Sequence, residues 1–300
     1  MSVWKAHAPG VRFAASLMAV VAICPVVAGC SVADDKKAGG GEGPPVPEVT
    51  AFRQIDSAAD LELPVAPYLF SDPELSRLMG ARELLIRECM QELGFDYQTP
   101  DGSRAVGPRT LTERRYGLAD VTQAKRDGYH LFGPEVRPEP KLPPEQYRAV
   151  TGEGSGKDIP KGGCAGQAER ALGGEKPFGP SDLAQTINGK SYELSMRDNR
   201  VRKVFTSWSA CMRKQGYTYK DPMAAMSAPE FSAEEIGPGE TETAQHDVKC
   251  KEKVNLIGVW HAVESAYQKE LVQEHASELR LVLEAKREQL KESRKMMSGA

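Results

Sequence analysis

The sequence is poor in aromatic residues and in the motifs that mark known catalytic centres. Phe, Trp and Tyr make up 7% of the 300 residues, whereas 28 Gly and 21 Pro interrupt the chain. Runs with the two-residue period of strands are few, so a large sheet is not expected. Neither Gly-x-Ser-x-Gly nor His-Glu-x-x-His occurs, so two signatures of hydrolytic enzymes are missing. This composition predicts modest helical cores joined by long irregular connections.

An excess of positive charge is lacking as well. The chain has 39 Lys and Arg against 42 Asp and Glu. Residues 1–29 contain Lys5 and Arg12 and no acidic residue, so the chain after them has 37 basic and 42 acidic residues and a net charge of −5. The two signs are well mixed along the sequence. No nucleic-acid partner is therefore expected.

The first 29 residues have the pattern of an export signal. Lys5 and Arg12 precede an apolar run, residues 13–27, that is short for a membrane span. The run ends in Val27-Ala28-Gly29-Cys30, which resembles the lipobox of bacterial lipoprotein precursors. The resemblance implies cleavage before Cys30 and attachment of diacylglycerol and fatty acids such as palmitate. The alternatives are an ordinary cleaved signal and an uncleaved anchor.

Residues 30–64 are predicted to be a flexible tether. They include a Gly- and Pro-rich stretch, residues 36–47, that has too few apolar side chains to build a core. Such a tether would hold the folded part away from the lipid surface.

One twelve-residue pattern occurs twice in the chain. Residues 89–100 and 211–222 both read Cys-Met-x-x-x-Gly-aromatic-x-Tyr-x-x-Pro. Each copy follows a helical run of apolar residues, and Gly94 or Gly216 stands where a helix ends in a left-handed residue. A short extended aromatic segment comes next. The pattern indicates an internal duplication; the alternative is two unrelated helix ends with the same capping chemistry.

Four cysteines follow Cys30, namely Cys89, Cys164, Cys211 and Cys250. An even number of cysteines outside the cytoplasm predicts two disulfides, and four cysteines allow three pairings. A duplicated module should hold its own disulfide, which favours Cys89–Cys164 and Cys211–Cys250. Metal binding is the alternative, but no Cys-x-x-Cys or Cys-x-x-His spacing supports it.

The expected fold is mainly α with minor β, in two helical modules that are each stapled by one disulfide. The first module is predicted at residues 65–180 and begins with a helix at 71–93, where Ser71 and Glu74 form a capping box. The second is predicted at residues 181–300. Its first helix is expected at about 191–215, and a long C-terminal helix is expected from about 240 to 296.

Candidate site residues are few. The histidines after Cys30 are His130, His246, His261 and His275; the last three are too far apart along one helix to share a metal. No catalytic residue, metal ligand or cofactor is predicted. The candidate binding residues are the aromatics of the two repeats, Phe95, Tyr97, Tyr217 and Tyr219. The alternative, which we favour, is that these rings pack in the cores of the modules or against each other.

Several segments together resemble actinobacterial envelope lipoproteins of uncharacterised function. They are residues 27–30, Arg115-Tyr116-Gly117, Gly162-Gly163-Cys164, both repeats, and residues 249–260. The resemblance covers most of the chain after residue 29. It implies an exported, membrane-tethered protein and no known reaction.

The sequence therefore favours a non-enzymatic lipoprotein on the extracytoplasmic face of the cell membrane. Its partner would be another envelope protein or a cell-wall polymer. Apolar residues of the C-terminal helix beyond Tyr267, such as Leu271, Leu279 and Val282, are expected to pack on the first module, to pack on another chain or to lie partly exposed. Packing on another chain would make them a partner surface. The alternative is an extracytoplasmic hydrolase with a site assembled from scattered residues. A transporter solute-binding protein is disfavoured, because strands are few.

Overall fold

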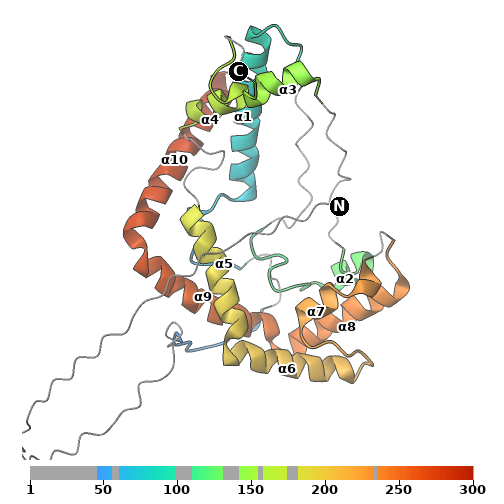
Figure 1. The fold of residues 1–300 in the computed structure, drawn as a ribbon. Helices are drawn as coiled ribbons and strands as arrows, with labels where there is room; N and C mark the ends of the chain where they lie inside the picture. Colours follow the sequence, from blue (N-terminus) through green and yellow to red (C-terminus); the bar gives the residue numbers. More distant parts are fainter. Residues whose placement is uncertain are drawn as a thin grey trace, which may run out of the picture. The chain divides into compact units, whose positions relative to one another are not determined.

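The computed structural model describes residues 46–55, 61–98, 110–130, 142–154, 158–173, 182–232 and 235–299 (Figure 1). All of these residues belong to one compact unit. They form α-helices and two short 3-10 helices, and no strand occurs among them. The mainly helical part of the expected fold is therefore confirmed. The minor β part is not seen among the described residues, because residues 95–98 and 217–219, where short strands are expected, have no regular secondary structure.

The elements follow one another along the chain as η1 (Ala66–Tyr68), α1 (Asp72–Glu92), α2 (Val121–Asp127), α3 (Pro144–Thr151), α4 (Gly163–Ala171), α5 (Asp182–Arg197), α6 (Asn199–Arg213), α7 (Pro222–Met226), η2 (Pro229–Phe231), α8 (Pro238–Val254), α9 (Leu256–Glu274) and α10 (Ala276–Gly299).

Local capping chemistry sets the ends of α1, as the sequence indicates. The backbone N–H of Ser71 donates to Glu74 Oε2 at 2.8 Å, which is half of the predicted capping box. At the other end Gly94 has a φ of +82°, a left-handed conformation that glycine adopts without steric cost. Gly216 stands at the same position of the second repeat, just after the end of α6, and has a φ of +92°.

Both predicted disulfides are present. Cys89–Cys164 joins α1 to α4, and Cys211–Cys250 joins α6 to α8. Each bond lies beside apolar side chains. Cys164 is fully buried with Met90 and Ala168, and Cys250 belongs to the largest hydrophobic cluster. The disulfides therefore link helices that also pack against each other.

That largest cluster gathers side chains of α5, α6, α8 and α9 around Trp208 and Trp260, which are both fully buried. Helix α5 lies along α9, and α6 crosses both α8 and α9. Helix α2 packs on α8 (Figure 1). A second cluster joins Leu63, Val65 and Leu69 to Ile187 of α5 and Leu279 of α10.

The predicted single helix over residues 240–296 is wrong, because the chain breaks twice there. Asn255 adopts a left-handed conformation with φ +52° and separates α8 from α9. A contact distant in sequence accompanies this break, since a Cβ at Gly258 would lie 2.0 Å from the Arg53 carbonyl oxygen. The second break is at His275. The long C-terminal helix is confirmed as α10, which has 24 residues.

The predicted helix over residues 191–215 also divides. Asp198 separates α5 from α6 and accepts a hydrogen bond from the backbone N–H of Arg200 at 2.8 Å. A short acidic side chain in this position caps a helix start, so the sequence held a signal for this boundary.

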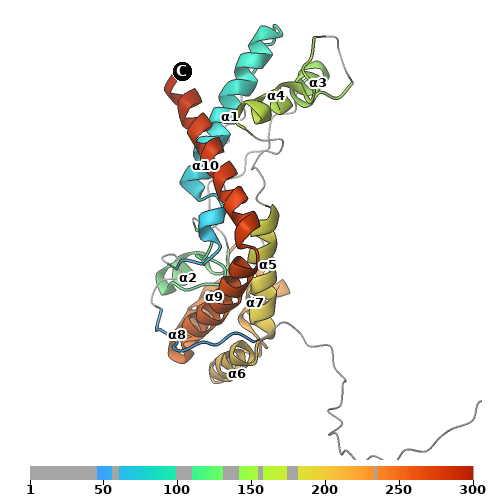
Figure 2. The same cartoon turned by 90° about the vertical axis from the view of Figure 1, so that its left-hand side faces the viewer.

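Helix α10 packs along α1 (Figure 2). Leu271, Leu279 and Val282 are each 6% exposed or less. Packing against the same chain is therefore the alternative that the structure confirms, and the expectation of a partner surface at these residues is wrong.

The described part of the predicted tether contacts the helices. Arg200 Nη1 donates to the Pro47 carbonyl oxygen at 2.9 Å, and Gln54 Nε2 donates to the Glu252 carbonyl oxygen at 3.1 Å. Leu63 is 2% exposed. Residues 30–45 and 56–60 of the predicted tether lie outside the described residues, as do the predicted signal and the predicted lipidation site, Cys30.

Candidate functional site

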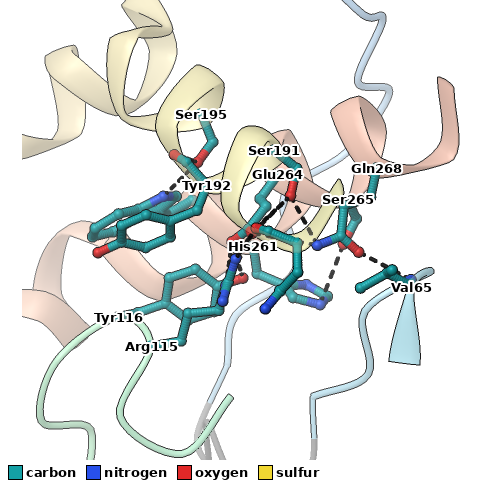
Figure 3. A network of polar contacts seen from close by, with 12 residues as sticks. Val65, Arg115, Tyr116, Ser191, Tyr192, Ser195, His261, Glu264, Ser265 and Gln268 are labelled. Carbon is teal, nitrogen blue, oxygen red and sulfur yellow. Dashed lines mark hydrogen bonds and ion pairs between the residues drawn. The ribbon is translucent and has the colours of Figure 1, made fainter. Parts of the chain in front are cut away.

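Among the residues that the structure describes, the most extensive buried polar cluster is centred on Glu264, whose side chain is fully buried on α9 (Figure 3). Arg115 Nε donates to both carboxylate oxygens, at 2.9 and 3.0 Å. The Tyr116 hydroxyl donates to Oε2 at 2.8 Å, and the Ser191 hydroxyl lies 3.3 Å from Oε1. The carboxylate therefore receives hydrogen bonds from three side chains of two other parts of the chain, and Gln268 Nε2 of its own helix donates to Oε1 at 3.5 Å.

Arg115 is held on its remaining sides. Its Nη2 donates to the Asn188 carbonyl oxygen at 2.7 Å, and its guanidinium carbon lies 4.8 Å from the centre of the Tyr192 ring. The Tyr192 ring in turn stacks on Trp260 at 5.3 Å. A planar guanidinium that contacts a carboxylate edgewise and an aromatic face is strongly constrained. These contacts orient residues 114–117 against α5 and α9.

Burial and the neighbouring charges shift the pKa values of three side chains in this cluster. Burial by itself lowers the pKa of Arg115, but the hydrogen bonds and charge of Glu264 outweigh it and raise that pKa above its ordinary value. Burial, together with the adjacent Glu264 carboxylate, raises the pKa of Tyr116 well above its ordinary value. Burial also raises the pKa of Tyr192 to about 12, although the Arg115 cation opposes the shift. The two tyrosines are therefore neutral donors, and Arg115 is a permanent cation.

Gln268 extends the cluster to the N-terminal part of the described chain. It accepts from the Val65 backbone N–H at 3.0 Å and donates to the Ser191 hydroxyl at 2.9 Å. Trp260 Nε1 donates to the Ser195 hydroxyl at 2.8 Å. The cluster thus ties the segment before η1 and the segment around Arg115 to the α5–α9 pair.

A second buried ion pair lies on α8. Lys251 Nζ donates to Asp247 Oδ2 at 2.8 Å and to the Leu118 carbonyl oxygen at 3.0 Å, and both charged side chains are 1% exposed or less. Trp208 Nε1 donates to Asp247 Oδ1 at 2.9 Å. Burial raises the pKa of Asp247 and lowers that of Lys251, while their mutual attraction opposes both shifts. Gly117 lies directly on this lysine, since a Cβ there would be 2.6 Å from Nζ.

A third buried acid, Glu240, stands at the start of α8. It accepts from the Tyr129 backbone N–H at 2.7 Å and lies 2.9 Å from His130 Nδ1. The Glu240 side chain is 3% exposed and that of His130 is 24% exposed. These bonds join the end of α2 to α8.

The predicted aromatic binding residues divide between two clusters. Tyr97 is 7% exposed and packs with Cys89 and Cys164, and Phe95 packs partly against the same cluster. Tyr217 and Tyr219 pack partly against the largest cluster, with their rings stacked at 6.5 Å. The two repeats therefore do not bring their rings to one common surface.

The four histidines do not meet in the described structure. His261 lies 2.9 Å from the Glu62 carbonyl oxygen, and His246 contacts the Tyr217 ring at 5.7 Å. His275 is 3.5 Å from Glu278. Within the described ranges, no three His, Cys, Asp or Glu residues gather in a way that could hold a metal ion. No helix of that part of the chain is both long and apolar enough to cross a membrane.

Comparisons with protein-family models, curated proteins and solved structures find no match to this chain. Its chemistry must therefore be judged from its own geometry.

In all three polar clusters, the acid is engaged by donors of the same chain. Glu264 is surrounded by an arginine, a tyrosine and a serine, and Asp247 by a lysine and a tryptophan. Acids that are saturated in this way hold segments together and are poorly placed to take a proton from a substrate. Sequence reasoning did not identify these acids. The only local signal was the Asp247–Lys251 spacing of four residues, which puts both side chains on one helix face.

Proposed function

We propose that this chain is a non-enzymatic lipoprotein that is anchored on the extracytoplasmic face of the cell membrane and acts by binding. The observation that supports an extracytoplasmic location is the pairing of Cys89, Cys164, Cys211 and Cys250 into two intramolecular disulfides. Such bonds persist in oxidising compartments and are rare in the cytoplasm. The lipobox-like residues 27–30 supply the proposed anchor, Cys30.

The engagement of the buried acids favours binding over catalysis. Glu264, Asp247 and Glu240 each hold at least two donors of the same chain. A rigid helical body with internal polar ties presents its outer surface unchanged to a partner, which is what a binding protein requires. An envelope protein or a cell-wall polymer is the proposed class of partner. The two disulfide-linked halves would then be two modules of one binding body.

The anchor is tested on protein taken from its own membrane. We expect intact-mass and peptide analysis to find residue 30 as the N-terminus with diacylglycerol and a fatty acid attached. The variant Cys30→Ala should lose this mass and move from the membrane fraction to the soluble fraction. A native chain with residue 30 unmodified would overturn the anchor.

Binding is tested by crosslinking in cells with the anchored protein and with Cys30→Ala. The control is an unrelated lipoprotein that carries the same residues 1–45. A partner that is captured by this chain and not by the control supports the proposal. If no partner is captured, and the purified chain instead hydrolyses envelope esters, peptides or glycans, the hydrolase alternative replaces it.

A further inference from the structure

The charged residues on the exposed face of α6 are all basic. Residues 199–220 contain six Lys and Arg and no Asp or Glu, although the whole chain has a net charge of −3. Val201, Val204, Phe205, Trp208 and Met212 are buried in the core, and the basic side chains between them are exposed. We call Arg202, Lys203, Arg213 and Lys214 the α6 basic face.

The described part of the chain does not neutralise the α6 basic face. None of its four side chains forms an ion pair with a residue that the structure describes. The nearest acid in sequence, Asp198, is bonded to Arg200 at 2.7 Å through its Oδ2. The span from residue 202 to residue 214 is about 18 Å at the helical rise. Between its ends lie the small side chains Thr206, Ser207 and Ala210, which leave both ends accessible to a flat surface.

The chain enters the described unit at the beginning of this helix. The Pro47 carbonyl oxygen accepts from Arg200 Nη1 at 2.9 Å. Sixteen residues lie between Cys30 and Pro47, and a tether of the predicted kind has an average reach of about 20–25 Å. Val46 and Phe52 are 70% and 43% exposed, so apolar side chains occur close to this entry point. If Cys30 is lipidated, the N-terminal end of α6 is held within a tether length of the membrane.

We propose that the α6 basic face docks on the anionic phospholipid headgroups of the membrane to which the chain is anchored. This proposal rests on the proposed lipid anchor, which supplies proximity. Each basic residue near an anionic membrane surface increases the partition of a protein about fivefold, and the attraction acts within a Debye length, about 10 Å at 0.1 M salt. The anchor makes the encounter intramolecular, so a few such residues are enough to orient the body.

The test uses full-length protein that is purified from its own membrane and reconstituted into vesicles. One set of vesicles is phosphatidylcholine alone, and the other contains about one third phosphatidylglycerol. Acetylation by a water-soluble reagent is followed by mass spectrometry at Lys203 and Lys214, with Lys291 of α10 as the reference. We expect both α6 lysines to react at least fivefold more slowly on the anionic vesicles, and Lys291 to react equally on both. Salt at 0.5 M should abolish the difference.

Matched variants keep the reporting lysines. Arg202→Gln with Arg213→Gln removes half of the α6 basic face and should abolish most of the protection. Arg287→Gln with Arg294→Gln removes the same charge from exposed positions of α10 and should leave the protection intact. All four arginines are exposed, so the fold should persist in both variants.

The outcomes separate the two proposals. Equal acetylation on neutral and anionic vesicles overturns docking, whatever the state of Cys30. Equal loss of protection in the α6 and α10 variants also overturns docking by α6, because the net charge of the chain would then explain the protection. An unmodified Cys30 in the same sample overturns the anchor. In that case the chain should still float with anionic vesicles, and only the α6 variant should lose this binding. Such a result would support docking of the α6 basic face without the anchor. Protection by soluble polyphosphate and not by anionic vesicles would replace the membrane with a polymer partner.

Discussion

Removing the charge of Glu264 while keeping its shape tests whether the buried cluster holds the fold together. In Glu264→Gln, the Arg115 guanidinium keeps its positive charge in a site where its side chain is 11% exposed. Breaking a buried ion pair by removing one partner costs about 3–5 kcal/mol of unfolding free energy. We expect the lower end, about 3 kcal/mol, because Arg115 keeps the Asn188 carbonyl oxygen and the Tyr192 ring as partners.

The assay is urea unfolding at pH 7 with the disulfides intact, followed by circular dichroism and by tryptophan fluorescence. A thermal scan of the same samples is the second measurement. In a domain of this size 1 kcal/mol shifts the melting temperature by about 2–4 °C, so the variant should melt about 6–12 °C lower. The double variant Arg115→Gln with Glu264→Gln should cost less than the sum of the two single variants, with a coupling of at least about 1 kcal/mol.

The matched control is the half-exposed pair Arg82–Glu169, whose side chains are 31% and 17% exposed. Glu169→Gln should cost about 1 kcal/mol or less, as partly solvated pairs do. A Glu264→Gln variant that is as stable as this control would refute the reasoning. If the same variant also lost a partner that the native chain binds, Glu264 would belong to a binding site instead.

Three other changes have defined expectations. Replacing Cys211 and Cys250 by Ala opens a loop with a sequence separation of 39. The free energy of unfolding should fall by up to about 4 kcal/mol, measured from the shift of the urea midpoint. An unchanged midpoint would show that helix packing alone holds α6 and α8 together. Gly117→Ala should lower the free energy of unfolding by more than Gly216→Ala. Both glycines have a positive φ, but only at Gly117 would the new Cβ meet another side chain, 2.6 Å from Lys251 Nζ. Equal losses of stability would contradict the described contact. Burial raises the pKa of Asp198, but hydrogen bonds from its arginine partner outweigh burial and lower the pKa below its ordinary value, so its stabilisation is complete above pH 4 and is lost on further acidification. Asp198→Asn should therefore lose less stability between pH 5 and pH 2 than the native chain, and parallel curves would contradict this.

Features that depend on neighbouring residues could be predicted from the sequence. The start of α1 follows from Ser71 and Glu74, and its end follows from Gly94, because capping bonds and backbone dihedrals involve residues within one turn. The duplicated Cys-Met pattern led to the correct disulfides, since a repeated module must be able to hold its own bond.

Only the tertiary structure decided how distant segments meet. Arg115 and Glu264 are 149 residues apart, and nothing in the sequence around either residue predicts that the two side chains pair. The break at Asn255 lies beside the close approach of the Arg53 carbonyl oxygen to Gly258, and the apolar face of α10 is covered by α1. An apolar stripe shows that a helix face must be buried but does not show which surface will bury it. That choice depends on the packing of the whole chain, because many pairs of helical faces satisfy the same local rules.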